Sequence, residues 1–329
     1  MKQYIIVILL IQSLICLAQG EDNFTASDML KSMNTDDKAA ILMVYFGSTH
    51  DDTRALTIEP LNRKVKDIYR DIEVREAFTS RMVIRSLKAK GVEKLNPVEV
   101  LEKLNTDGFT HIIVQSTNII EGAEMEVLRR EVAGMAGLFK DIRIGNPLLY
   151  SPDDYKAVIE ALIPAGNSHD AVNADGNYST AKMGKNHDTP KADYQPPYDA
   201  TTVWVGHGTY TPATAQYAML DYMLKAKGYK NYFVATVEGY PSLEEVIAEL
   251  EKSGAKKIVL RPFLFVAGDH AKNDIAGDMK GALEDKGYQV EVLMEGLGQD
   301  ENIQNIFIDH IRFSLSHKVT DIIEKKKTL

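Results

Sequence analysis

The amino-acid sequence predicts an α/β fold of two Rossmann-like domains, each an open parallel sheet, with a cleft between them. Short β-branched runs alternate with helical patterns along most of the chain, as expected for parallel strands joined by crossover helices. The second half also repeats the pattern of the first half. A chain of 329 residues is long enough for two domains of ordinary size, each with its own core.

The first twenty residues predict a signal peptide, residues 1–20. An apolar stretch at 4–17 is followed by small residues up to Gly20. Because this stretch is short for a membrane span, we expect cleavage after Gly20 and a protein that is exported to the periplasm or another extracytoplasmic site. An uncleaved anchor is one alternative. A lipoprotein anchored through Cys16 is another, although the large Ile15 before the cysteine argues against it.

The composition excludes several classes of protein. Cys16 is the only cysteine, so the mature chain can form no disulfide, thiolate metal site or cysteine nucleophile. The net charge of −9 becomes −10 without residues 1–20, which hold Lys2 and no acid. Such an acidic chain is a poor nucleic-acid binder. No other apolar stretch is long enough to cross a membrane, and the sequence leaves a homo-oligomer open.

Composition divides the mature chain into four parts. These are a loose polar leader (21–38), an N-terminal α/β domain (39–164), a flexible insertion (165–200) and a C-terminal α/β domain (201–329). The insertion is rich in Asn, Asp, Gly and Pro and has no apolar period, which is typical of a flexible loop. It should therefore contribute little to either core.

The secondary structure follows from hydrophobic periodicity. Five short apolar runs predict buried strands, at 41–46, 110–114, 202–205, 232–234 and 258–260. Apolar residues spaced by three and four predict helices between them, as in Ile58, Leu61, Val65 and Ile68. The same spacing in Leu243, Val246, Ile247 and Leu250 predicts a helix that Gly254 ends.

The two halves of the chain are related by a weak repeat. Residues 110–131 lie over residues 256–277 at a constant offset of 146, which pairs Gly122 with Gly268. Two similar open sheets facing each other should bind a ligand in the cleft between them.

Three ionisable side chains follow successive strands of the second half. His207 lies in GHGT, Glu238 in VEGYP and His270 in GDH. Because the carboxyl ends of parallel strands share one edge of the sheet, we expect the three to converge. Two imidazoles and a carboxylate suit a divalent transition metal and leave coordination positions open. A lone histidine is more often structural, but three groups at matching strand ends favour a metal site in the C-terminal domain.

Other residues are candidates for substrate binding. Gly208 and Thr209 precede a helix, where backbone N–H groups can bind anions. Arg54 and Arg81 can recognise carboxylates by forked hydrogen bonds, with a surface salt bridge as the alternative. Glu124 stands at the first-half position that matches His270, and it either faces the cleft or serves as a first-turn acid of a helix. No dinucleotide, P-loop or hydrolase motif is present, so we expect no organic cofactor.

On these residues the chain resembles the anaerobic sirohydrochlorin cobaltochelatases of the CbiK type, over nearly the whole mature chain. The matching stretches are, in order, AFTSRMVIRSL, GHGT, TVEGYP, RPFLFVAGDHAKNDIAGDM and EGLGQDENIQNIFIDHI. The resemblance implies the class II chelatase fold and insertion of Co²⁺, or alternatively Fe²⁺, into sirohydrochlorin, as in anaerobic cobalamin biosynthesis. It also implies that His207, Glu238 and His270 bind the metal substrate and that His207 accepts a proton.

The chain departs from the family pattern in its signal peptide and its insertion at 165–200. Asn118 also stands where many members of the family have a histidine. Export leaves two alternatives open. One is a haem- or tetrapyrrole-binding or metal-removing protein that serves iron or haem uptake. The other is a two-lobed periplasmic metal-binding protein, although that class usually joins its lobes by a long helix that this sequence does not show.

Overall fold

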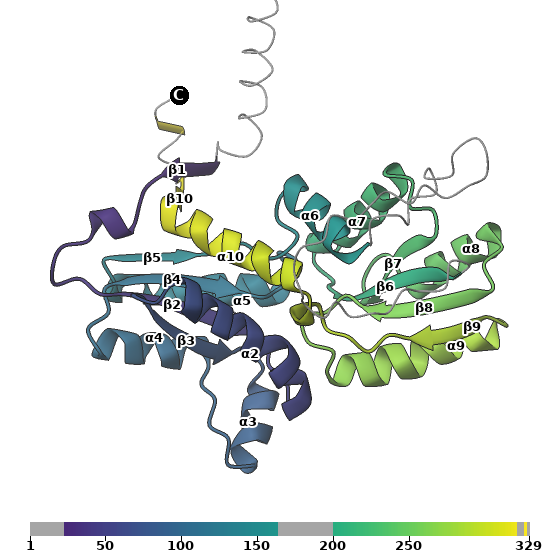
Figure 1. Cartoon of the computed structure of the whole chain (residues 1–329), viewed down its shortest axis with the longest axis horizontal. Helices are drawn as coiled ribbons and strands as arrows, with labels where there is room; N and C mark the ends of the chain where they lie inside the picture. The colour runs from purple at the N-terminus through teal and green to yellow at the C-terminus, as the bar shows by residue number, and fades with distance from the viewer. Residues whose placement is uncertain (1–22, 164–199, 321–325, 328–329) are drawn as a thin grey trace, which may run out of the picture.

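The computed structural model describes residues 23–163, 200–320 and 326–327 (Figure 1). The expected signal peptide at 1–20 lies outside the described residues, as does all of the expected insertion except Ala200. Within the described part of the chain, no helix is both long and apolar enough to span a bilayer.

The first half forms a four-stranded parallel sheet in the order β3-β2-β4-β5. Its strands are β2 (Ala39–Tyr45), β3 (Glu73–Phe78), β4 (His111–Ser116) and β5 (Asp141–Ile144). Side chains alternate between the two faces, so that Ile41 and Met43 enter one core cluster and Leu42 and Val44 another. Both faces are covered by helices, namely α2 (Asp51–Ile68), α3 (Arg81–Ala89), α4 (Pro97–Thr106) and α5 (Ala123–Met135).

The second half repeats this topology in the order β7-β6-β8-β9. Its strands are β6 (Thr201–Gly208), β7 (Tyr232–Glu238), β8 (Lys257–Pro262) and β9 (Gln289–Val292). Its helices are α7 (Ala215–Ala226), α8 (Leu243–Ser253), the π-helix η6 (Ala271–Met279) and α9 (Lys280–Asp285). Strand β4 begins at His111 and β8 at Lys257, which keeps the offset of 146 residues found in the sequence. The expected fold of two similar open parallel sheets is confirmed.

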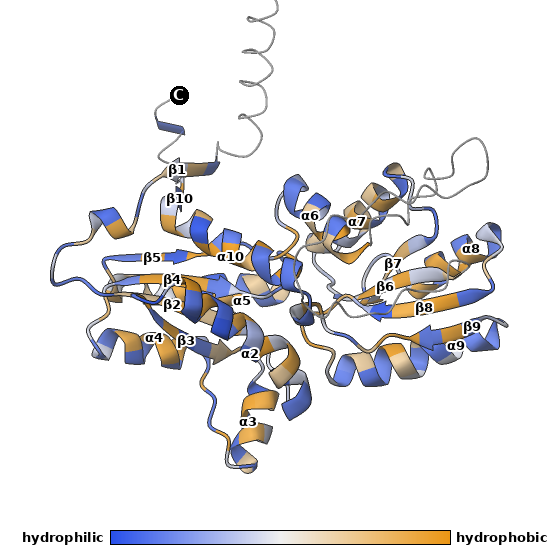
Figure 2. Cartoon of the chain, in the orientation of Figure 1, coloured by the Kyte–Doolittle hydropathy of each residue, from blue (hydrophilic) through white to orange (hydrophobic). Residues whose placement is uncertain are grey.

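The expected helices are present where the periodicity placed them. In α2, Ile58, Leu61 and Val65 are buried, whereas Ile68 at its end is exposed. Helix α8 ends at Gly254, whose φ of 74° is the left-handed conformation that glycine adopts readily. In Figure 2 the inner strand β4 is mainly hydrophobic, in keeping with its burial between helices.

The two lobes are joined by helices α6 (Pro152–Leu162) and α10 (Glu301–Ser316). Although α10 follows the second sheet in the chain, it contacts β4 and α6 and lies over the first sheet (Figure 1). Helix α6 in turn contacts α7 of the second lobe. A single core cluster consequently includes Ile41 of β2, Phe307 of α10 and Trp204 of β6. The C-terminal domain expected at 201–329 therefore gives its last helix to the first lobe.

A buried polar contact fastens these two helices. Nε2 of His310 on α10 lies 3.0 Å from Oδ1 of Asp154 on α6, and Nδ1 of His310 lies 3.1 Å from the carbonyl oxygen of Asn146. Asp154 also accepts hydrogen bonds from the backbone N–H and hydroxyl of Ser151. Because a buried carboxylate needs such partners, the contact defines how α10 sits on α6.

The polar leader is more ordered than expected. Strand β1 (Phe24–Ala26) pairs antiparallel with β10 (His317–Val319) at the other end of the chain, and Met29 is fully buried. The Arg143 side chain donates to the carbonyl oxygens of Ser27, at 2.7 Å, and His317, at 3.1 Å. The prediction of a loose leader is therefore wrong for residues 23–29, because their backbone pairs with residues 315–320 at the far end of the chain.

Candidate metal-binding site

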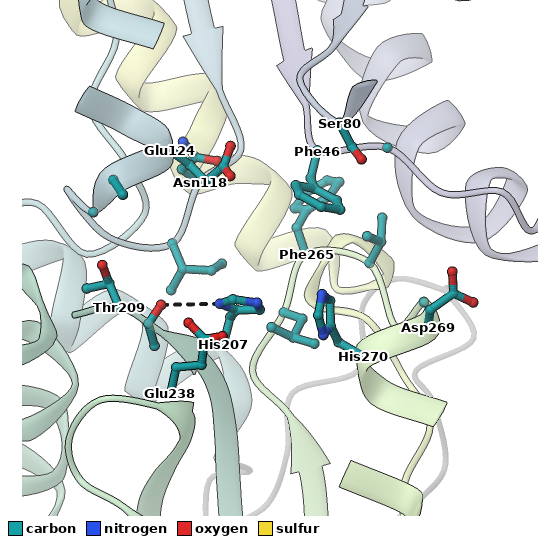
Figure 3. A pocket seen from close by; sticks show the side chains of 18 of the residues that line it. Phe46, Ser80, Asn118, Glu124, His207, Thr209, Glu238, Phe265, Asp269 and His270 are labelled. Atoms are coloured by element: carbon teal, nitrogen blue, oxygen red, sulfur yellow. Dashed lines mark hydrogen bonds between the residues drawn. The ribbon is translucent and has the colours of Figure 1, made fainter. Parts of the chain in front are cut away.

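A cavity of about 610 Å³ opens at the carboxyl ends of both sheets and is lined by both lobes (Figure 3). The first lobe contributes the loops that follow β2 and β4 and the starts of α3 and α5. The second lobe contributes the ends of β6 and β7 and the loop after β8. This is the crevice where open α/β sheets bind ligands, and its volume suits a small organic molecule.

The walls of the cavity are apolar and acidic. Apolar side chains come from both lobes, among them Phe46, Met82, Ile119, Ile120, Phe265 and Val266. Four carboxylates also line it, those of Glu124, Glu238, Asp269 and Asp274. Among the described residues that line the cavity there is no lysine or arginine. The walls therefore suit an apolar ligand and a cation better than an anionic group.

His207 is the second-last residue of β6, and Glu238 is the last residue of β7. The two lie side by side because Gly208 pairs in register with Glu238. Gly208 has a φ of +85°, and a Cβ there would stand 1.6 Å from the carbonyl oxygen of Glu238. Only glycine allows this approach, so the GHG sequence is what brings the imidazole next to the carboxylate.

His270 reaches the same cavity from the loop after β8, at the start of η6. Its ring meets that of His207 edge to face, with the centroids 4.6 Å apart. Nδ1 of His270 lies 2.6 Å from Oδ2 of Asp274. Since a carboxylate accepts hydrogen bonds, Nδ1 carries the proton and Nε2 keeps the lone pair that a metal ion needs.

The structure thus brings His207, Glu238 and His270 to one cavity, as the sequence predicted. Within the described ranges, however, no three His, Cys, Asp or Glu side chains already stand in a metal-coordinating arrangement. The two histidine rings are adjacent and nearly perpendicular to each other. The role of the three as metal ligands stays a prediction.

The other candidates divide into two groups. Gly208, Thr209 and Glu124 line the cavity, and Glu124 is also an acid of the first turn of α5. Arg54 and Arg81 do not line it.

Both arginines make other contacts. Arg54 donates to the carbonyl oxygen of Ser48, at 2.7 Å, and pairs with Asp51, which leaves its side chain only 11% exposed. It supports the turn before α2. The guanidinium of Arg81 lies 3.8 Å from Glu131 on the surface, so the salt-bridge alternative describes it.

Sequence reasoning missed several residues of the site. The spacing of four between His270 and Asp274 on a helix was a signal for their contact. The contact between His50 and Asp269, 2.8 Å across the two lobes, had no local signal, because 219 residues separate them. In the sequence, the apolar residues of the cavity walls could not be distinguished from ordinary core residues.

The fold is that of the class II chelatases. A structure of SirB from Bacillus subtilis with Fe³⁺ has a TM-score of 0.55 and 17% identity, covering 84% of this chain and 96% of that one. The sirohydrochlorin chelatase SirB from Bacillus subtilis subspecies spizizenii in complex with cobalt has a TM-score of 0.51 and 15% identity, covering 84% and 95%. At such identities the likeness shows the fold.

Within this class, the chain belongs to the cobalt chelatase (CbiK) family, whose model matches residues 39–172 and 177–316. It is 32% identical over 289 residues to the sirohydrochlorin cobaltochelatase of Salmonella typhimurium, covering 86% of this chain and 99% of the relative. It is 28% identical over 288 residues to the sirohydrochlorin cobaltochelatase of Nitratidesulfovibrio vulgaris, covering 85% and 91%. The family match includes all of residues 165–200 except 173–176, so most of the expected insertion aligns with the family.

Proposed function

We propose that this protein is a tetrapyrrole metal chelatase that inserts Co²⁺ into sirohydrochlorin. The observation that carries the proposal is the convergence of His207, Glu238 and His270 on one cavity between the lobes. Membership of the cobalt chelatase family supports it, as do two relatives that are named sirohydrochlorin cobaltochelatase. Fe²⁺ is the alternative metal substrate.

The residues suit the chemistry of metal insertion. Metallation removes two pyrrole N–H protons and replaces the ligands of the ion with ring nitrogens. His207 would accept one of the two protons, because a neutral imidazole is a good base near neutral pH, and water at the mouth of the cavity would take the other. His270 and Glu238 would hold the ion until it transfers, and a site without thiolates binds such an ion loosely enough to release it.

The apolar walls would hold the faces of the macrocycle. Phe46 and Phe265 stand on the side of the cavity opposite Glu238 in Figure 3, and Met82 and Tyr210, both largely exposed, also line it. Because no lysine or arginine is among the described lining residues, the carboxylates of sirohydrochlorin would point toward solvent at the rim.

The lack of a lysine or arginine among the described lining residues favours a second candidate function. A cavity whose described lining has no cation also suits a tetrapyrrole with few carboxylates, such as haem. We propose that the signal peptide directs export, and an exported haem-binding or metal-removing protein would fit that location. The two-lobed periplasmic metal-binding protein gains no support, because the chain belongs to the cobalt chelatase family.

An absorbance assay tests the proposal. The purified protein is mixed with sirohydrochlorin, and the spectral change on metallation is followed with Co²⁺ or with Fe²⁺. We expect insertion well above the rate without protein, and no acceleration by the His207→Ala protein. If wild type and His207→Ala give the uncatalysed rate while both bind haem, the second candidate replaces the first.

A further inference from the structure

The segment that carries His270 belongs to the second lobe but packs on the first. It leaves β8 at Pro262, and the ring of Phe265 contacts Tyr45 of β2 and Phe307 of α10, with centroid distances of 5.7 Å in both cases. Phe265 is 7% exposed. The apolar part of this segment is therefore fixed to the first lobe before the chain reaches His270.

The polar part of the segment is held by His50, which precedes α2 of the first lobe. Nε2 of His50 lies 2.8 Å from Oδ1 of Asp269, and Nδ1 lies 3.4 Å from Nζ of Lys272. The two contacts agree on one tautomer, because Nε2–H donates to the carboxylate and Nδ1 accepts from the ammonium group. One imidazole from the first lobe thus bridges the residues on both sides of His270.

These contacts contribute little to stability. The His50 side chain is 31% exposed and that of Asp269 is 63% exposed, and solvent weakens polar contacts at such positions. These contacts can instead control the position of the segment that carries His270. A shift of His50 relative to the second sheet would move Asp269 and Lys272, and with them His270, relative to His207 and Glu238, which are fixed at the ends of β6 and β7.

We propose that His50 is a positioning residue of the metal site, which couples the separation of the two lobes to the distance of His270 from His207 and Glu238. The inference rests on the proposed function and extends it to the first lobe. His50 would thereby set how closely His270 approaches the other two side chains, which line the same cavity.

The test compares His50→Ala, His50→Gln and Lys64→Ala in the full mature chain. Co²⁺ affinity is measured by calorimetry, and insertion kinetics are measured with Co²⁺ and sirohydrochlorin varied in turn. For His50→Ala we expect Co²⁺ affinity and kcat/KM for Co²⁺ to fall about tenfold, the low end for residues that orient a metal ligand. The KM for sirohydrochlorin and the thermal unfolding midpoint should stay the same, which a merely structural loss would not allow.

The conservative variant and the control make the test specific. His50→Gln should recover most of the loss, because the Gln amide can donate to Asp269 as Nε2–H does. Lys64→Ala removes a contact of the same helix, 3.2 Å from Lys64 Nζ to Glu301, that does not touch the His270 segment, and it should match wild type. If His50→Ala binds and inserts Co²⁺ like wild type, the inference is overturned and the proposed function stands.

A double-mutant cycle with Asp269→Ala gives an independent measurement. If His50 acts through Asp269, the double variant should lose no more Co²⁺ affinity than the worse single variant. Losses that multiply would show that His50 acts on its own and would also overturn the inference. If wild type inserts no metal at all, the proposed function fails, while the effect of His50→Ala on Co²⁺ binding still decides the positioning role.

Discussion

The imidazole rings of His207 and His270 meet edge to face, 4.6 Å between centroids and 89° between planes, although one ring ends a strand and the other begins a π-helix. Two rings this close can bind one ion once each turns a nitrogen toward it, since metal–nitrogen distances are about 2.0–2.1 Å. A π-helix is uncommon and tends to occur at functional sites. The arrangement is therefore the part of the molecule where substitution should be most informative.

We expect His207→Ala and His270→Ala each to abolish metal insertion while the protein stays folded. Both side chains are at least partly exposed, so their loss should change the free energy of unfolding by only about 0.5 kcal/mol. Glu238→Gln should weaken Co²⁺ binding but preserve tetrapyrrole binding, because it removes a charge and keeps the size. Calorimetric Co²⁺ titration and the insertion assay measure both effects. Wild-type metallation by both histidine variants would place the site elsewhere.

Asp274→Asn should lower Co²⁺ affinity roughly 10- to 100-fold, because the carboxylate that orients His270 through Nδ1 is lost. The matched control is Asp278→Asn, which changes an exposed carboxylate of the same π-helix. Co²⁺ titrations of the two variants at one pH make the comparison. Equal affinities would mean that the contact between His270 and Asp274 does not matter for metal binding.

Gly208→Ala should destabilise the protein by roughly 3 kcal/mol or more and separate His207 from Glu238, because it combines backbone strain with a clash. Gly91→Ala is the control, since Gly91 has a similar φ of +80° but nothing within 4 Å of its added Cβ. It should cost only roughly 1–2 kcal/mol, the strain alone. Urea unfolding and Co²⁺ binding of both proteins test this, and similar losses in the two would refute the clash.

The contact of Asp154 with His310 should make stability depend on pH. Burial raises the pKa of Asp154, but its hydrogen bonds to His310 and Ser151 outweigh burial and hold the pKa below its usual range. The stabilisation is therefore present above about pH 3.9, the ordinary value for Asp, and is lost as pH falls through the lower folded value.

Asp154→Asn should therefore lose about 1–3 kcal/mol of the free energy of unfolding at pH 7. This difference in the free energy of unfolding, the gap between variant and wild type, should disappear under acid conditions. The control is Asp153→Asn, because that carboxylate is 87% exposed in the same first turn and should show almost no gap. Urea unfolding at several pH values provides the data. A gap that stays constant down to pH 3 would rule out the ionised carboxylate as its source.

Export predicts that the mature chain begins at Glu21. Mass spectrometry of protein from the native host should find this terminus, since the apolar stretch at 4–17 is followed by a site typical of signal-peptide cleavage. A replacement of Ile8 by Arg in the apolar stretch should leave precursor in the cytoplasm. Intact Met1 on wild-type protein in the cytoplasmic fraction would remove the prediction.

The inner parts of the fold could be predicted from the sequence. Strands β2, β4, β6 and β8 are buried on both faces, and such strands read as short apolar runs. The convergence of His207, Glu238 and His270 followed from the topology, because parallel strands end at one edge. Each of these predictions used a pattern within a few residues and one rule about sheets.

Three of the four edge strands of the two parallel sheets could not be predicted in this way, whereas the fourth, β7, contains the predicted apolar run at 232–234. Strands β3, β5 and β9 lie at the edges of their sheets and carry charged residues such as Glu73, Arg143 and Glu291. Strands β5 (DIRI) and β9 (QVEV) alternate charged or polar residues with apolar ones, so hydrophilic and hydrophobic colours both occur along them in Figure 2. Polar edge strands avoid pairing with other chains, but that same property removes the apolar run by which a strand is recognised.

Contacts between distant parts of the chain were also beyond sequence reasoning. Nothing in the composition of the leader indicates that Phe24–Ala26 pair with His317–Val319, and nothing near Arg54 indicates that it binds the Ser48 carbonyl instead of a ligand. In both cases the partner is a backbone group, which every residue has. A contact with a backbone group therefore cannot be recognised from the residue type of the partner.

Helix α10 follows the second sheet in the chain but packs on the first sheet, and this limits when the first lobe can fold during synthesis. The buried side chains Ile303, Phe307 and Ile311 cover the first sheet, yet they leave the ribosome after the whole second sheet. The first lobe consequently cannot complete its core until translation has passed Ser316. A chain stopped before Glu301 would expose the apolar face that contains Ile113 to water. For a protein proposed to be exported, such late completion delays folding until the signal peptide has long been available to the secretion machinery.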